Sequence, residues 1–265
     1  MYKDMHIHLE NCGYHKKALL QIVKQACSMA IDEIGIVEHT HRFNEFKPLY
    51  RDVLALGGPM SEFYLNKQTI SISAYLGFIE EMKKEQWPIK INYGLEICYF
   101  PQFEEFLYEQ MHNYPFDFYI GSVHHIDNAA FDLKGISEAY LWSVISSDEI
   151  YNKYYRLVEA LLRFGQFEVV GHIDTIKLFN YYPTYDLKPT YEKLAKLAKR
   201  QLMIVENNSG AHYRYHHKDI GINQEFLREL IKQQVKIHTA SDAHYPRDVG
   251  KYVDELSELT DKNFT

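Results

Sequence analysis

The stretch DMHIHLE, residues 4–10, places two histidines one residue apart inside an otherwise apolar run. In an extended strand, alternate side chains point to the same face. His6 and His8 are therefore expected to project together from one side of whatever sheet this strand enters. Two neighbouring imidazoles in a buried place resist joint protonation, but they can share a metal ion. The alternative is a pair of hydrogen-bonded surface histidines.

Six further apolar, β-branched stretches follow, and segments with helical character separate them. The seven stretches are residues 3–8, 33–39, 89–97, 117–124, 167–173, 202–208 and 235–244. The segments with apolar residues at helical spacing are 16–30, 72–86, 101–113, 148–165, 188–201 and 223–234. Strands alternating with helices predict a mostly parallel sheet, here a single α/β domain built as a (β/α) barrel. A doubly wound open sheet is the alternative. Residues 43–69 and 126–147 are expected to be loops over the open face.

Composition excludes several classes of protein. The chain has 265 residues, of which 46% are hydrophobic and 25% charged, and its formal net charge is −7. Negative charge argues against a nucleic-acid partner, and no stretch approaches the roughly 20 apolar residues of a membrane-spanning helix. The polar N-terminus does not resemble a signal peptide. Three cysteines without metal-type spacing predict a reduced, cytoplasmic protein. No feature of the sequence predicts an oligomeric state.

Histidines and carboxylates gather where the predicted strands end. They are His6 and His8, Glu38 and His39, Glu96, His124 and His125, His172 and Asp174, and Asp242 with His244. In barrels of this kind, the chemistry lies at the carboxyl ends of the strands. Strand alternation lets only one of the neighbours His124 and His125 face inward. These nitrogen and oxygen ligands are more numerous than one tetrahedral ion can bind. A polynuclear site with a bridging carboxylate is therefore expected, and it would hold zinc, iron or manganese.

These pieces together resemble the polymerase and histidinol phosphatase (PHP) family of metal-dependent phosphoesterases. The matching segments run in the family's order from residue 6 to residue 244: HIHLENCGYH, EHTHRF, GLEICYF, GSVHH, GHIDTIKLF, ENNSGAHYR and SDAH. Within the family, the chain is most similar to the histidinol-phosphate phosphatases. This similarity lies in the glycine two residues before Glu96, the SVH, the GHID-x-x-K-x-F and the N-S-G. Those enzymes remove phosphate from L-histidinol phosphate in histidine biosynthesis.

The resemblance implies a distorted (β/α)7 TIM-like barrel, as one phosphoesterase domain over residues 1–265, and a centre of two to three divalent transition metals. Carried over by motif, the first metal would be held by His6, His8, Glu96 and Asp242. The second would be held by the bridging Glu96 with His124 and His172, and the third by His15, His39 and His244.

The implied activity is hydrolysis of a small phosphomonoester, with L-histidinol phosphate as the implied substrate, by a hydroxide that bridges the first two metals. Lys177 and Arg214, with Arg42 in THRF, are expected to stabilise charge on the phosphoryl oxygens. Asp242 or a nearby histidine is expected to protonate the leaving alkoxide. The alternatives are a solvated helix residue for Lys177 and a surface charge on a loop for Arg214.

L-Histidinol phosphate carries an ammonium and an imidazole, so an acidic partner is expected near the mouth of the site. Glu10, Glu45 and Asp127 are the candidates for this partner.

The alternative functions fall into three classes. Within the family, the substrate could be another small phosphoester or phosphotyrosine, whereas negative charge disfavours an exonuclease. A metal-dependent amidohydrolase also opens with H-x-H, but it usually bridges its metals through a lysine, where Glu96 stands here. A non-catalytic metal-binding domain is disfavoured because every expected ligand position carries a ligand-type residue.

Overall fold

Seven strands form one parallel sheet in the computed structural model, which describes residues 2–261. The strands lie in the strictly sequential order β1-β2-β3-β4-β7-β8-β9. They are β1 (Tyr2–Ile7), β2 (Ile31–His39), β3 (Lys90–Cys98), β4 (Phe118–Ser122), β7 (Val169–Val170), β8 (Ile204–Asn208) and β9 (Ile237–Ala240). Each strand overlaps the stretch predicted from the sequence. The doubly wound alternative is wrong, because its strand order would reverse direction at a switch point.

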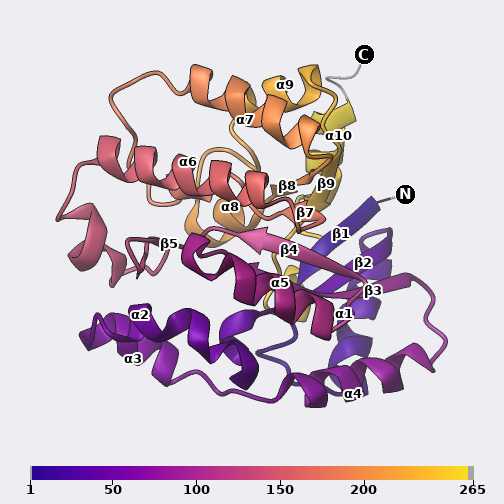
Figure 1. The fold of residues 1–265 in the computed structure, drawn as a ribbon. Helices are drawn as coiled ribbons and strands as arrows, with labels where there is room; N and C mark the ends of the chain where they lie inside the picture. The colour runs from indigo at the N-terminus through magenta and orange to yellow at the C-terminus, as the bar shows by residue number, and fades with distance from the viewer. Residues whose placement is uncertain (1, 262–265) are drawn as a thin grey trace.

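The first and last strands meet and nearly close the barrel (Figure 1). Ile7 and Ala243 form a single parallel bridge, and the backbone N–H of His8 donates to the Ala243 carbonyl at 2.8 Å. Beside this bridge, the buried carboxylate of Asp4 accepts from the backbone N–H of Ser241 at 2.8 Å and of Gly250 at 2.9 Å. We call this contact between β1 and the β9 end the seam. The buried Asp4 carboxylate therefore accepts hydrogen bonds from backbone N–H groups that the ladder between the strands does not pair.

Helices cover the outside of the barrel. Those predicted from apolar periodicity are confirmed as α1 (Lys16–Ser28), α4 (Ile72–Lys83), α5 (Glu104–Asn113), α6 (Ser147–Phe164), α7 (Lys188–Arg200) and α9 (Gln224–Lys232). Outside the two long insertions, the helices that were not predicted are α8 (Gly210–Tyr215) and α10 (Val253–Asp261). In α6, the Ser146 hydroxyl caps the N-terminus by accepting from Glu149 N, and Gly165 ends the helix in the left-handed conformation at φ 62°.

A small apolar cluster fills the barrel interior. It consists of Met5, Val37, Phe118, Ile120 and Val169, which come from β1, β2, β4 and β7. The Phe118 ring needs the space left by Gly35, where an added Cβ would lie 2.8 Å from the ring and 2.4 Å from the Met5 carbonyl oxygen. The cluster supports the strands whose carboxyl ends carry the ligand-type residues.

The two long insertions are partly regular, so the prediction that they are loops is wrong. Residues 43–69 contain η2 (Asn44–Tyr50), α2 (Arg51–Leu54) and α3 (Gly58–Leu65). Residues 126–147 contain the end of the hairpin β5 (His125–Ile126) and β6 (Ala129–Ala130), and then η4 (Glu138–Trp142). Both insertions bury apolar side chains, which stabilise local structure that turn residues alone would not predict.

The three cysteines are free thiols. Within residues 2–261, none of the helices combines the length and the hydropathy needed to cross a bilayer.

Candidate metal centre

Glu96, on β3 and 2% exposed, lies at the centre of a ring of imidazoles. Its Oε2 lies 3.1 Å from His39 Nε2 and 3.4 Å from His6 Nε2. Its Oε1 lies 2.9 Å from His172 Nε2 and 3.3 Å from His124 Nε2. The two oxygens of one carboxylate thus face two different sets of histidines. This is the arrangement needed for a carboxylate that bridges two cations.

The charge state of Glu96 fits such a role. Burial alone would raise the pKa of Glu96, but His39, His6 and His124 together hold that pKa well below its usual range. The carboxylate therefore stays ionised at any physiological pH.

Strand register explains how these side chains meet. In the parallel ladder between β2 and β3, His39 pairs with Glu96. His124 follows β4 and faces His172, with 3.2 Å between their Nε2 atoms. The adjacent His125 points the other way, with its Nε2 2.8 Å from the Tyr64 hydroxyl. The structure thus brings His124 into the centre and directs His125 into the apolar wall, as alternation predicts.

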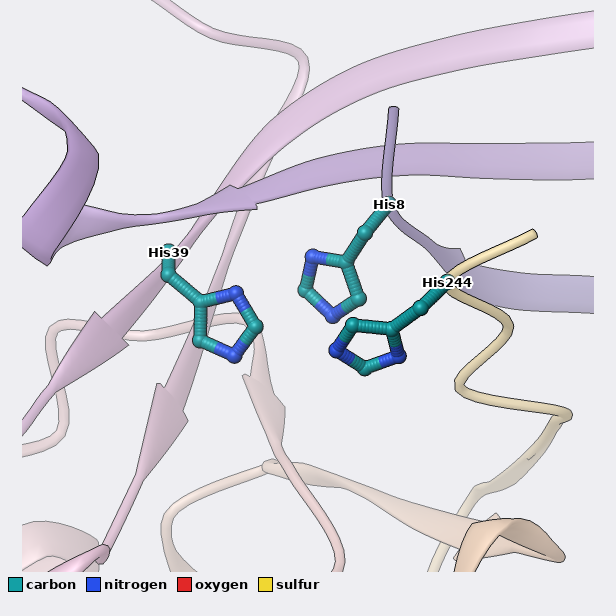
Figure 2. A group of neighbouring side chains, drawn as sticks. All are labelled: His8, His39 and His244. Atoms are coloured by element: carbon teal, nitrogen blue, oxygen red, sulfur yellow. The ribbon is translucent and has the colours of Figure 1, made fainter. Parts of the chain in front are cut away.

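A second group of imidazoles joins the two ends of the barrel. His8 from the end of β1, His39 from β2 and His244 from the loop after β9 point toward one another in Figure 2. The His8 ring centroid lies 4.1 Å from that of His39 and 4.4 Å from that of His244. Burial, together with His39 and His244, holds the pKa of His8 well below its ordinary value. Neutral imidazole is the form that binds metals.

The structure does not bring His15 into this group, which corrects the expectation for the third metal. His15 is exposed, and its Nδ1 accepts from the backbone N–H of Ala18 at 3.1 Å, so it caps α1. Glu10 lies at the position expected for His15, with Oε2 3.3 Å from His39 Nδ1 and Oε1 4.0 Å from His244 Nε2. A signal for Glu10 was available, because it continues the two-residue period of His6 and His8.

Asp242 completes the ring from the last strand. Its Oδ1 lies 3.4 Å from His8 Nε2 and 4.0 Å from His6 Nε2. Burial would raise the pKa of Asp242, but the Arg214 guanidinium and a hydrogen bond from His8 hold it well below the usual range. Asp242 adopts φ 56° and His172 φ 23°. Such backbone conformations are disfavoured for residues with a Cβ, and here they turn two ligand-type side chains at the ends of strands.

The donor set fits divalent metals. Four groups have ligand atoms within 4.8 Å of one another: His6, His8 and Glu96; Glu96, His124 and His172; His8, His39 and His244; and Glu10, His39 and His41. Among the described residues, the buried Glu96 Oε2 has no hydrogen-bond partner, although imidazole nitrogens surround it. Imidazole and carboxylate without thiolate suit zinc, manganese or iron.

An outer carboxylate orients the first histidine. Glu206, fully buried on β8, accepts from His6 Nδ1 at 2.8 Å and from the backbone N–H of His172 at 3.1 Å. This bond fixes the His6 ring with its Nε2 toward Glu96. The role of Glu206 was missed from sequence, although the residue stands near the end of a predicted strand.

The centre opens into a cavity of about 450 Å³. Of the three cations expected to bind phosphate, only Arg214 and Lys177 line it. Lys177 is 5% exposed and donates to Asp174 at 2.8 Å, to Asp219 at 3.1 Å and to the Gly221 carbonyl at 2.6 Å. An ammonium has three N–H donors, so Lys177 has none left for a phosphate. It is neither the expected phosphate ligand nor a solvated helix residue.

Lys67, and not Arg42, lines the cavity. Arg42 Nε donates to Glu10 Oε2 at 2.8 Å, and the residue does not line the cavity, so it positions Glu10. Lys67, which was not predicted, lines the cavity with its Nζ 4.2 Å from the centre of the Phe63 ring. Arg214 NH2 lies 2.5 Å from Asp242 Oδ2 and NH1 2.9 Å from His244 Nδ1. Lys134, which is exposed, also lines the cavity, so the cations available to an anion there are Arg214, Lys67 and Lys134.

Comparisons with known proteins agree with this geometry. The sequence model of the PHP domain matches residues 4–210. A protein named "Probable histidinol-phosphatase" from Deinococcus radiodurans is 23% identical over 265 residues, which cover 97% of this chain and 92% of the relative. A protein of the same name from Schizosaccharomyces pombe is 22% identical over 256 residues, which cover 90% of this chain and 79% of the relative.

Solved structures show the same architecture. The crystal structure of a histidinol phosphate phosphatase from Lactococcus lactis, in complex with zinc, L-histidinol and phosphate, matches with a TM-score of 0.71 at 18% identity. The match covers 99% of this chain and 93% of that one, and it confirms the TIM-like barrel. Since the family match extends over most of the sequence, and its range includes nearly all the residues that surround Glu96, this chain belongs to the PHP domain family.

Proposed function

We propose that this protein is a metal-dependent phosphomonoesterase that hydrolyses L-histidinol phosphate to L-histidinol and phosphate, in histidine biosynthesis in the cytoplasm. The observation that supports this most is the Glu96 carboxylate, which faces two sets of imidazoles in a cavity that Arg214 also lines. The names of the two relatives from Deinococcus radiodurans and Schizosaccharomyces pombe support the choice of substrate.

Two to three divalent metals would be held by the residues that the structure brings together. The first would be bound by His6, His8, Glu96 and Asp242, and the second by Glu96, His124 and His172. The third would be bound by His39 and His244, with Glu10 in place of His15. When bound, such metals supply Lewis-acid activation of water and of the phosphoryl oxygens.

The protein's own residues would move the proton and stabilise the phosphate. Asp242 is held ionised by Arg214, so it accepts a proton before it can donate one. A proton that Asp242 takes from the attacking water is then available for the leaving alkoxide, which balances the reaction. Arg214 and Lys67 would stabilise the negative charge of the phosphoryl oxygens.

Phosphate release tests this function directly. Purified enzyme is expected to hydrolyse L-histidinol phosphate with a higher kcat/KM than p-nitrophenyl phosphate, because the names of both relatives indicate the former as substrate. A chelator should abolish both activities, and zinc or manganese should restore them. Comparable kcat/KM values for both esters would favour a phosphatase for another small phosphoester. If the enzyme hydrolysed neither ester, a metal-dependent amidohydrolase would be favoured.

Replacing Arg214 with methionine separates phosphate binding from metal binding. Arg214→Met is expected to lower kcat/KM on every phosphomonoester by ~10²–10³, the scale of removing one group that stabilises developing charge. The inhibition constant of inorganic phosphate should rise in the same variant, because the guanidinium meets the product as well as the substrate. Unchanged phosphate inhibition combined with weaker metal affinity would show instead that Arg214 acts only on Asp242.

A further inference from the structure

Nearly every carboxylate that lines the cavity already has a partner. Glu10 pairs with Arg42, Asp174 with Lys177, Glu206 with His6 and Asp242 with Arg214, while Glu96 faces the ring of histidines. Asp132 is the exception, because no lysine or arginine of the described residues forms an ion pair with it. The structure thus contains one carboxylate in the cavity wall that has no lysine or arginine partner among the described residues, and whose electrostatic neighbours are His124 and His172.

Asp132 lies between the metal centre and the apolar part of the wall. It follows the hairpin β5–β6 and lines both the main cavity and an adjoining pocket of about 80 Å³. Leu133, of the same insertion, and Phe63, of α3, line both spaces beside it. Burial raises the pKa of Asp132 and outweighs the opposite effect of His124 and His172, so a further cation beside the ionised carboxylate would relieve the energetic penalty of its desolvation.

The acidic residues expected from sequence to meet a cationic substrate do not fill this position. Glu45 accepts from the backbone N–H of Ile72 at 2.9 Å, at the start of α4. Asp127 pairs with Lys153 at 2.5 Å on the exposed side of the insertion. Glu10 is held by Arg42 beside His39. Asp132 was missed because nothing in its local sequence distinguishes it from a loop residue.

We propose that Asp132 determines specificity by binding the cationic group of the leaving alcohol, so that the enzyme selects phosphomonoesters of amino alcohols. This inference rests on the proposed phosphatase function. A phosphate held beside Glu96 and Arg214 leaves the alcohol in the rest of the cavity, where Asp132 offers a negative charge that no lysine or arginine of the described residues pairs with. An alcohol without a cation would bury that carboxylate unpaired, and sites of this kind discriminate strongly against such ligands. Phe63 and Leu133 supply apolar surface for the body of the alcohol.

The test compares a cationic ester with a neutral one in the isosteric variant Asp132→Asn. The ratio of kcat/KM for L-histidinol phosphate to that for p-nitrophenyl phosphate is expected to fall by about 10- to 100-fold, mainly through KM, on the scale of a lost hydrogen bond to a charged group. Asp132→Glu, which keeps the charge, should retain part of the preference. Asp127→Asn is the matched control, because it makes the same change in the same insertion outside the cavity, and it should leave the ratio unchanged.

Three results would overturn the inference. The first is an unchanged ratio in Asp132→Asn, and the second is an equal loss on both esters together with lost metal, which would make Asp132 a support for His124 or His172. The third is a wild-type enzyme with no preference for cationic esters. If the wild type hydrolyses phosphomonoesters but not L-histidinol phosphate, the choice of substrate fails by itself. The role of Asp132 is then measured with O-phosphoethanolamine against propyl phosphate.

Discussion

Glu96→Gln is expected to remove almost all phosphatase activity and most of the bound metal. The substitution keeps the shape of the side chain but removes the charge that faces His6 and His39 on one side and His124 and His172 on the other. Two cations would then face each other without the anion between them. The loss in kcat should exceed the ~10²–10³ that follows from removing a single charge-stabilising donor. Elemental analysis should fall from between two and three ions per chain to one or none.

Glu206→Gln provides the matched control for this variant. It makes the same change in another buried glutamate, which touches His6 but lies outside the proposed ligand set. Loss of an outer partner of a metal ligand typically lowers metal affinity or activity by ~10–100-fold, so Glu206→Gln should be the milder variant. A Glu96→Gln enzyme that keeps its full metal content would contradict the bridging role.

The adjacent histidines 124 and 125 should give opposite phenotypes. His124→Ala is expected to lower kcat by several orders of magnitude with loss of metal, because His124 Nε2 lies 3.3 Å from Glu96 Oε1. His125→Ala should keep kcat within about tenfold per folded molecule, or roughly 1.4 kcal/mol in the barrier. Its effect should appear in thermal unfolding instead, because His125 is 4% exposed, packs against Phe100 and bonds to Tyr64.

Measuring kcat, metal content and the unfolding temperature on the same preparations separates the two cases. If His125→Ala lost metal and His124→Ala did not, the register of the strand that ends at Ser122 would be wrong, and with it the alternation argument for this part of the barrel.

The strands and most residues of the centre could be predicted because they obey local rules. A parallel barrel brings strand ends together, and alternation chooses which neighbour faces inward. Those two rules place His8, His39, Glu96, His124 and Asp242 in one region without knowledge of any long-range contact. The structure places all five there.

The remaining expectations depended on partners far away in the sequence. Whether Lys177 is free for phosphate depends on Asp219, 42 residues later, and on a carbonyl in the following loop. Arg42 is engaged by Glu10, 32 residues before it. His15 carries a ligand-type side chain, but a helix begins beside it and uses its nitrogen as a cap. No periodicity in the sequence records such pairings, so charge and residue type alone could not assign these roles.

The seam between β1 and β9 sets the order in which the centre can be assembled during synthesis. Asp4 and Ser241 are 237 residues apart, and they hold together the strand that carries His6 and His8 and the loop that carries Asp242 and His244. Contacts this distant in sequence form late, because closing so long a loop is entropically unfavourable. At translation rates of ~5–20 residues per second, the first histidines emerge from the ribosome many seconds before the last ligands exist. The proposed first metal therefore gains its last ligand, Asp242, only after the final strand has been made, whereas His6, His8 and Glu96 are synthesised long before.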